Sequence, residues 1–174
     1  MELAKKHILI TSLPGVGKTT LIKKVAKAMQ PVRPVGFFTE EIREKGVRKG
    51  FALVSLDGTR GVLSRIDVQS IFRVGKYGVD VAGFEAFLDT IDFLGTKTSL
   101  IIIDEIGKME CFSAKFKHLL NSIFNSDKRL IATIALKGGD IIEEIKKRSD
   151  VTLFKINARN RDLVLLEILT SFQG

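Results

Sequence analysis

Residues 8–20 read Ile8-Leu9-Ile10-Thr11-Ser12-Leu13-Pro14-Gly15-Val16-Gly17-Lys18-Thr19-Thr20, so that an apolar run meets a glycine-rich turn ending in Gly-Lys-Thr. An amphipathic helical pattern follows, with Leu21, Ile22 and Val25 on one face. Successive backbone N–H groups in such a strand–turn–helix unit curl around an anion, and the positive end of the helix faces it. The stretch therefore predicts a phosphate-binding loop and a nucleoside triphosphate ligand.

The loop residues have different chemical tasks. Gly15 and Gly17 have no Cβ and allow the backbone to follow the tight path. Lys18 supplies a mobile charge for the β and γ phosphates, and the Thr19 hydroxyl is a ligand for Mg²⁺. The other positions predicted to bind the nucleotide are Ser12, Leu13, Pro14, Val16 and Thr20.

The first position of the loop departs from the usual pattern. That pattern has Gly five residues before the Gly of Gly-Lys-Thr, whereas this chain has Ser12. A small residue is compatible with the loop because this position mainly opens the turn. The alternative is an ordinary strand–turn–helix corner that carries Gly-x-Gly-Lys-Thr by chance, and a second motif is needed to decide.

A second apolar run, Leu100–Ile103, ends in two acidic residues. Its β-branched composition is typical of a strand buried on both faces, and ligand sites in parallel sheets lie at the carboxyl ends of such strands. This is the Walker B arrangement, in which Asp104 holds Mg²⁺, usually through a water. Glu105 follows directly and is suited to deprotonate a water that attacks the γ-phosphate. We therefore predict Lys18 and Glu105 as catalytic residues and Thr19 and Asp104 as metal ligands.

Alternating strand and helix patterns predict an α/β fold with a mainly parallel central sheet and helices on both faces. A β-rich block with an Asp57-Gly58 hairpin turn is expected to extend the sheet as an antiparallel edge. Residues 40–49 are interpreted as a polar connection and residues 74–79 as a loop. The expected strands are 7–11, 35–39, 50–56, 61–66, 99–105, 130–136 and 151–156, and the expected helices are 17–29, 80–94, 116–124, 140–148 and 161–172.

Two helix starts carry capping signals. Asp80 is placed to cap the helix that presents Phe84 and Phe87. Asp140 with Glu143 forms a pattern similar to a capping box.

Composition limits the class of protein. A chain of 174 residues with 45% apolar residues is expected to form a single domain, residues 1–174. The single Cys111 excludes an internal disulfide and predicts a reducing, cytoplasmic location. No stretch approaches the length of a membrane span.

The net charge of +8 comes from 28 Lys plus Arg against 20 Asp plus Glu. Basic residues are mixed with acidic ones, as in residues 40–45, and no Arg-and-aromatic stacking platform is present. Nucleic-acid binding is therefore not expected. The expected partners are nucleoside triphosphates, and the chain is expected to be a monomer or a weak oligomer.

Several polar residues remain open candidates. Glu110 is either a second carboxylate near the metal or a solvated acid, and Lys108 either faces the phosphates or lies on the surface. Thr133 is placed to sense the γ-phosphate if its strand lies between those of Lys18 and Asp104. His7 and His118 are interpreted as structural. Candidates for the additional transition-state cation are Arg43, Arg48, Arg65, Arg73 and Arg161.

The string Asp104-Glu105-Ile106-Gly107-Lys108-Met109-Glu110 resembles the thermophilic nucleoside-triphosphatase family, which is related to the vertebrate cancer-related nucleoside triphosphatase. Residues 14–20, 36–41, 48–51, 74–79, 84–85 and 160–162 extend the resemblance over nearly the whole chain. It implies a three-layer, RecA-like P-loop fold and Mg²⁺-dependent hydrolysis of several triphosphates. It also implies that the loop after the last strand lies by the nucleobase, which makes Asn160 and Arg161 candidate nucleotide-binding residues.

The leading hypothesis is a Mg²⁺-dependent phosphohydrolase that converts NTP and water to NDP and phosphate, with broad and slow use of ATP, GTP, CTP and UTP. A nucleotide or nucleoside kinase is the alternative and requires an acceptor pocket, for which the region under residues 74–79 is a candidate. A nucleic-acid-stimulated ATPase is a further alternative, motivated by the charge of +8.

Overall fold

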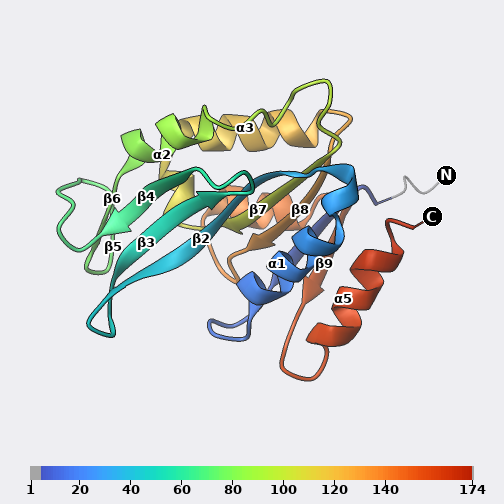
Figure 1. Ribbon diagram of the computed structural model, residues 1–174, viewed down its shortest axis with the longest axis horizontal. Coiled ribbons are helices and arrows are strands. Elements are labelled where there is room, and N and C mark those ends of the chain that lie inside the picture. The colour runs from blue at the N-terminus through green and yellow to red at the C-terminus, as the bar shows by residue number, and fades with distance from the viewer. Residues whose placement is uncertain (1–4, 174) are drawn as a thin grey trace.

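A nine-stranded mixed sheet forms the centre of the computed structural model, which describes residues 5–173 (Figure 1). Its strand order is β5-β6-β4-β3-β2-β7-β8-β1-β9. The strands are β1 His7–Thr11, β2 Val35–Glu44, β3 Val47–Ser55, β4 Arg60–Arg65, β5 Arg73–Val74, β6 Tyr77–Val79, β7 Leu100–Ile106, β8 Arg129–Ile134 and β9 Val151–Lys155.

The five strands β2, β7, β8, β1 and β9 are parallel and form the core of the sheet. Strand β8 lies between β1 and β7, with Ile131 paired to both Ile8 and Ile102. The carboxyl ends of β1 and β7 consequently lie at the same edge of the sheet, one strand apart. This arrangement brings the predicted phosphate-binding loop and the Asp104-Glu105 pair to one place.

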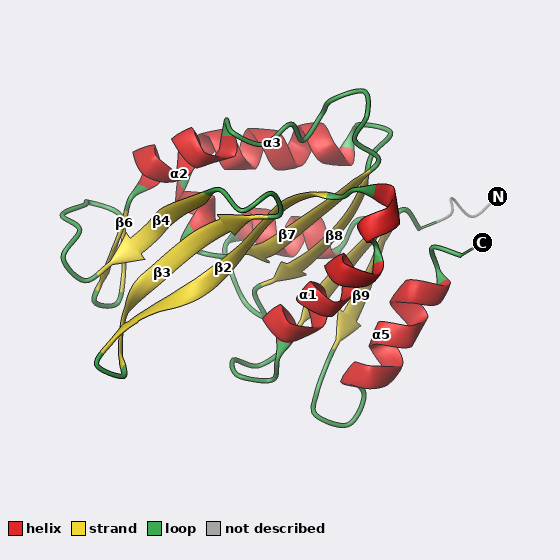
Figure 2. Ribbon diagram, viewed as in Figure 1, coloured by secondary structure: helices red, strands yellow, loops and turns green. Residues whose placement is uncertain are grey.

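Helices cover both faces of the parallel strands (Figure 2). On one face lie α1 Lys18–Ala28 and α5 Arg161–Thr170, and on the other lie α2 Val81–Leu88, α3 Ala114–Phe124 and α4 Asp140–Lys146. The side chains of β7 contribute alternately to two apolar cores, one on each face of the sheet, because successive side chains of a strand point to opposite faces. Ile101 and Ile103 pack toward α2, α3 and α4, whereas Leu100 and Ile102 pack toward α1 and α5. The predicted three-layer α/β fold is confirmed.

The antiparallel extension is larger than expected, because two predictions there were wrong. Residues 40–49 are not a polar connection: β2 continues to Glu44 and β3 begins at Val47, around a turn at Lys45-Gly46 with φ of 50° and 77°. This ribbon projects from the sheet (Figure 1) and is exposed for much of its length. It lacks the apolar alternation of a half-buried strand, so that its pattern is that of a loop. The predicted Asp57-Gly58 turn does join β3 to β4.

Residues 74–79 are likewise not a loop but part of the short β5–β6 hairpin, with Gly75-Lys76 as its turn. Tyr77 and Val79 are buried, and the guanidinium of Arg73 donates to the Lys76 carbonyl at 2.8 Å. Strands of two and three residues are too short to show a period in the sequence.

Of the two predicted helix caps, one is confirmed. The Asp80 carboxylate accepts a hydrogen bond from the Gly83 amide at 2.9 Å at the start of α2. The capping box at Asp140 is wrong, because Gly139 occupies the cap position and no side chain caps α4. Asp140 instead lies in the first turn, where its charge suits the positive end of the helix.

His7 is fully buried at the start of β1. Its Nδ1 accepts a hydrogen bond from the Leu130 amide at 3.2 Å, so that the neutral ring carries its proton on Nε2, 3.8 Å from Asp150 Oδ2. Its ring packs edge-on against Phe124. Burial lowers the pKa of His7 to about 4, and the charge of Asp150 opposes this shift only in part. The predicted structural role of His7 agrees with this environment.

Acidification is expected to destabilise the protein through His7. Because the pKa of His7 is lower in the folded than in the unfolded chain, the unfolded chain binds more protons below about pH 6.5. The stabilising contribution is complete above that pH and is lost as the pH falls toward 4. We expect the free energy of unfolding to decrease by about 2 kcal/mol from this group between roughly pH 8 and pH 5.

Urea denaturation at the two pH values measures this effect in the wild type and in His7→Gln. The Gln side chain can accept from the Leu130 amide but does not titrate, so the variant should show a smaller loss of stability. His118→Gln, at an exposed position of α3, is the matched control. Equal losses in wild type and His7→Gln would contradict the assignment.

Candidate active site

The loop between β1 and α1 has the backbone shape that an anion requires. Gly15 and Gly17 have φ of 79° and 106°, in a region that disfavours side chains. Gly17 is the N-cap residue of α1 and has no side chain of its own to cap the helix. The first N–H groups of α1 are therefore open toward this loop, where an anion is stabilised by the helix terminus. Leu13, Pro14 and Gly15 are exposed.

Ser12, the departure from the usual pattern, is buried with 1% of its surface exposed. Its hydroxyl donates to the Leu13 carbonyl at 2.7 Å. The hydroxyl is therefore used within the loop itself and leaves the concave backbone path open.

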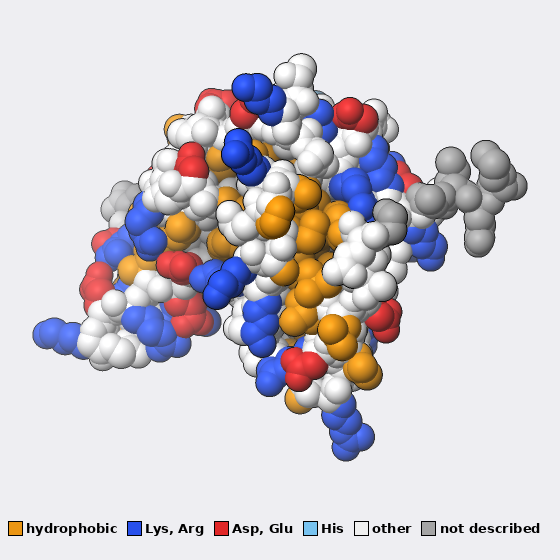
Figure 3. All heavy atoms as spheres, turned by 45° about the vertical axis from the view of Figure 1, so that its right-hand side comes forward, with side chains coloured by type: hydrophobic (Ala, Val, Ile, Leu, Met, Phe, Trp, Pro, Cys, Tyr) orange, Lys and Arg blue, Asp and Glu red, His pale blue; other side chains and the backbone are white. Residues whose placement is uncertain are grey.

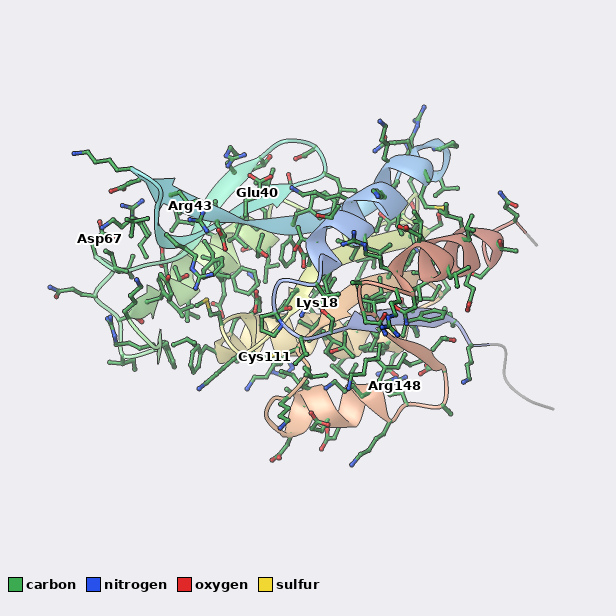
Figure 4. The ribbon with its side chains drawn as sticks, turned by 90° about the horizontal axis from the view of Figure 1, so that it is seen from below. Lys18, Glu40, Arg43, Asp67, Cys111 and Arg148 are labelled. Carbon is green, nitrogen blue, oxygen red and sulfur yellow. The ribbon has the colours of Figure 1, made fainter. Side chains whose placement is uncertain are left out.

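Two contacts join the loop to the end of β7. Lys18 Nζ lies 3.1 Å from Glu105 Oε2, and the Thr19 hydroxyl donates to Asp104 Oδ2 at 2.8 Å. Lys18 is labelled near the middle of the view in Figure 4. A cis peptide bond joins Asp104 to Glu105. The fold thus brings together all four residues that the sequence predicted as catalytic or metal-binding.

Asp104 is held on both oxygens. Its Oδ1 accepts from the Thr133 hydroxyl at 2.6 Å, opposite the contact with Thr19. Only 2% of Asp104 is exposed, and burial raises the pKa of its carboxyl, against the effect of these two hydrogen bonds. Thr133 lies on β8 between the two motif strands, as its predicted role requires. Its hydroxyl nevertheless donates its hydrogen bond to Asp104 and so orients that carboxylate.

Glu110 is not a solvated acid, because only 4% of it is exposed. Burial, and next the negative charge of Glu105, raise the pKa of the Glu110 carboxyl well above its usual value. A Cβ on Gly107 would lie 2.6 Å from Glu105 Oε1 and 2.8 Å from Glu110 Oε2. Gly107 therefore leaves the space that lets two carboxylates approach each other. In the sequence, the spacing of Glu105, Gly107 and Glu110 indicated a second carboxylate near the metal or a solvated acid. The exposed fraction of Glu110, which only the structure gives, decides between these two interpretations.

The residues fit a magnesium ion. Mg²⁺ prefers oxygen ligands and is usually bound through one or two protein groups together with substrate phosphates and waters. Thr19 Oγ1 and Asp104 Oδ2 are such oxygens and lie side by side at the phosphate loop. No group of three or more His, Cys, Asp or Glu side chains suited to a metal occurs within residues 5–173. The fit therefore depends on this oxygen pair and on the phosphates.

Arg161 and Asn160 lie at the start of α5. The Arg161 guanidinium donates to the Val16 carbonyl of the loop at 3.3 Å, and a Cβ on Gly17 would lie 3.4 Å from it. The Asn160 side chain instead holds its own loop, accepting from the Asn157 amide at 2.7 Å and donating to the Lys155 carbonyl at 3.0 Å. The structure thus brings Arg161 to the loop and engages the polar atoms of Asn160 elsewhere.

The other four candidate arginines lie on the antiparallel extension, where Arg43 is labelled in Figure 4. Arg43 and Arg48 pair with Glu41, and Arg65 pairs with Glu44 and Asp67. Arg73 donates to backbone carbonyls. Of the five candidates, Arg161 is the one that contacts the phosphate loop.

Comparison with known proteins assigns the chain to a family. The sequence matches the model of a family described as NTPase over residues 7–169. The chain belongs to the NTPase family. It is 47% identical over 164 residues to the nucleoside-triphosphatase THEP1 of Thermotoga sp. (strain RQ2), covering 94% of this chain and 93% of the relative. It is 39% identical over 185 residues to the human cancer-related nucleoside-triphosphatase, covering 97% of each chain.

Solved structures of the family share the fold. The crystal structure of THEP1 from the hyperthermophile Aquifex aeolicus matches with a TM-score of 0.81 and 34% identity, over 97% of this chain and 99% of that chain. The family predicted from the Asp-Glu-Ile-Gly-Lys-Met-Glu string is therefore confirmed.

Two further properties concern what the protein contacts: the distribution of charge on its surface and the length and polarity of its helices. On the face shown in Figure 3, Lys and Arg side chains are interspersed with Asp and Glu around exposed hydrophobic side chains. Within residues 5–173, each helix is too short or too polar to pass through a lipid bilayer.

Proposed function

We propose that the protein is a Mg²⁺-dependent nucleoside-triphosphatase that converts NTP and water to NDP and phosphate. The observation that carries this proposal is the double contact of Lys18 with Glu105 and of Thr19 with Asp104 across the ends of β1 and β7. In the proposal, Lys18 is the phosphate-binding cation, Thr19 and Asp104 supply the two oxygen ligands, and Glu105, paired with Lys18 before the nucleotide binds, is the carboxylate that acts on water. The relatives named nucleoside-triphosphatase support the same reaction.

The proposed mechanism assigns each side chain one task. The backbone amides of residues 13 and 15–19 bind the phosphates, and Lys18 turns from Glu105 to the β and γ phosphates. Glu105, released from its ion pair, orients the attacking water and accepts its proton. Thr133 keeps the Asp104 carboxylate in place through its hydrogen bond. Thr19 and Asp104 would hold Mg²⁺, which would supply positive charge toward the phosphates.

Broad base use is consistent with the loop after β9. Its Asn157 and Asn160 side chains accept hydrogen bonds from backbone amides of the same loop. Both polar atoms of the Asn160 side chain and the Oδ1 atom of Asn157 are engaged within the loop, which leaves few side-chain groups to distinguish the edges of different bases. We therefore expect ATP, GTP, CTP and UTP to be hydrolysed at comparable rates. The Arg161 guanidinium donates to the carbonyl of Val16 and is therefore not assigned to the γ-phosphate. Lys18 then supplies most of the positive charge that stabilises the transition state, so we expect a slow basal rate.

An acceptor-free hydrolysis panel tests the proposal. Purified protein is incubated with Mg²⁺ and each of the four triphosphates, and released phosphate is measured with and without EDTA. We expect Mg²⁺-dependent phosphate release from all four. Release from none of them above the level of a Lys18→Ala control would refute the hydrolase.

The same panel, repeated with an added nucleoside or nucleoside monophosphate and with added RNA or DNA, separates the alternatives. A kinase would phosphorylate a nucleoside or nucleoside monophosphate faster than it releases phosphate. A nucleic-acid-stimulated ATPase would respond to added RNA or DNA, whereas we expect an unchanged rate. A cytoplasmic location and a monomeric or weakly oligomeric state complete the proposal, and the single Cys111 supports the former.

A further inference from the structure

A cavity of about 200 Å³ lies next to Glu105, between the antiparallel extension and the segment that follows β7. Its apolar wall consists of Phe51, Leu63, Val74 and Met109. Glu105 and Glu110 also line it, as does the exposed Lys108. The proposed hydrolysis uses Glu105 alone among these residues.

The size of the cavity suits a small molecule. Drug-sized ligands occupy pockets of about 300–1,000 Å³, whereas an apolar cavity of about 150 Å³ can hold benzene. A space of about 200 Å³ therefore corresponds to one ring or a short branched chain with a single substituent.

The two carboxyl groups that line the cavity, those of Glu105 and Glu110, favour a cationic ligand. Glu110 is 4% exposed, and no Lys or Arg forms an ion pair with it within the described part of the chain. Ionising this buried carboxyl without a cationic partner is costly, which is why burial raises its pKa, and the cost is compensated when a cation pairs with it. Glu105 is paired with Lys18, but phosphates that draw Lys18 away would leave it with a free negative charge as well.

We propose that this cavity binds a small primary amine with an apolar body. The apolar body packs on Phe51, Leu63, Val74 and Met109, and the ammonium group donates hydrogen bonds to Glu110 and Glu105. A carboxylate that accepts from the ammonium group is less available to a water molecule. The amine consequently inhibits hydrolysis, and this last consequence rests on the proposed function.

Binding of benzylamine in the absence of nucleotide tests the site independently of hydrolysis. Ligand-observed NMR titration is carried out with benzylamine, with benzyl alcohol as its neutral analogue and with benzoate as its anionic analogue. We expect benzylamine to bind in the millimolar range, benzyl alcohol more weakly and benzoate not at all. Benzoate binding as tightly as benzylamine, or absence of benzylamine binding, would overturn the proposal.

Two variants locate the binding. Glu110→Gln should weaken benzylamine about tenfold or more, because the negative charge of the group that accepts from the ammonium is removed, and should leave benzyl alcohol binding unchanged. Retained benzyl alcohol binding shows that the cavity still forms. Val74→Phe should abolish binding of both by filling the space, whereas Val47→Phe, at an exposed position of β3, should not. Unchanged benzylamine binding in Val74→Phe would place it elsewhere and refute the site.

The effect on hydrolysis is measured afterwards, relative to the uninhibited rate of each protein. Inhibition by benzylamine in wild type and Val47→Phe, but not in Val74→Phe, supports the link to Glu105. If benzylamine binds but no hydrolysis is found in any sample, the amine site stands and the proposed function fails.

Discussion

Replacement of Glu105 by Gln is expected to lower the rate of NTP hydrolysis by about 10²–10⁴-fold and to leave nucleotide affinity intact. The fall corresponds to the usual contribution of a general base, since Gln cannot accept the proton of the attacking water. Affinity is expected to be retained because the proposed phosphate ligands are the loop backbone, Lys18 and the metal. It should rise slightly, because the variant removes a negative charge 3.1 Å from Lys18. Single-turnover hydrolysis and a fluorescent-nucleotide titration measure the two quantities.

Glu41→Gln is the matched control for this variant. Glu41 is also an ion-paired carboxylate, but it lies on the exposed part of β2 with Arg43 and Arg48 as partners. Its replacement should change neither rate nor affinity appreciably. If Glu105→Gln loses nucleotide binding together with hydrolysis, Glu105 holds the loop in place and is not the base.

Replacement of Lys18 by Ala is expected to reduce both nucleotide affinity and turnover, with kcat/KM lower by at least about 10²-fold. Mutagenesis of single groups that stabilise transition-state charge gives losses of about 10²–10³-fold. Lys18 additionally binds the ground-state phosphates, so its removal also raises KM. This combined effect distinguishes the variant from Glu105→Gln, in which affinity is preserved.

Lys23→Ala is the control for loss of a lysine from the same helix. Lys23 forms an ion pair with Glu40 at 2.9 Å and is partly exposed, outside the phosphate loop. An exposed pair of this kind contributes little to stability. The control should therefore retain wild-type kinetics. Comparable losses in Lys18→Ala and Lys23→Ala would mean that α1 tolerates no change in charge and that Lys18 has no special role.

The parts of the fold that could be predicted from sequence are those with a buried periodic pattern. The run Leu100–Ile103 is fully apolar because β7 is covered on both faces, and it therefore marks both the strand and the position of Asp104. Lys18 and Thr19 follow from the loop motif, whose backbone requirements are local. These residues are placed by short-range rules, which a single sequence displays directly.

The parts that could not be predicted depend on partners distant in the sequence. Residues 40–49 form strands because β2 and β3 pair with each other, although few of their side chains are buried. Glu110 lines one cavity with Phe51 and Leu63, which come from the extension and lie about 50 residues earlier in the chain. No spacing within the Asp-Glu-Ile-Gly-Lys-Met-Glu string shows whether its last carboxylate is exposed.

By itself, the sequence determined the phosphate loop, the Asp104-Glu105 pair and the alternation of strands and helices, because each is recorded in contiguous residues. The tertiary structure decided three further points: β8 between the two motif strands with Thr133 on Asp104, Arg161 at Val16, and a cavity in which Glu110 is buried. These depend on strand order and on contacts between residues as much as 145 positions apart. Such contacts are set by how the layers pack, and packing is a property of the whole chain and not of any one segment of it.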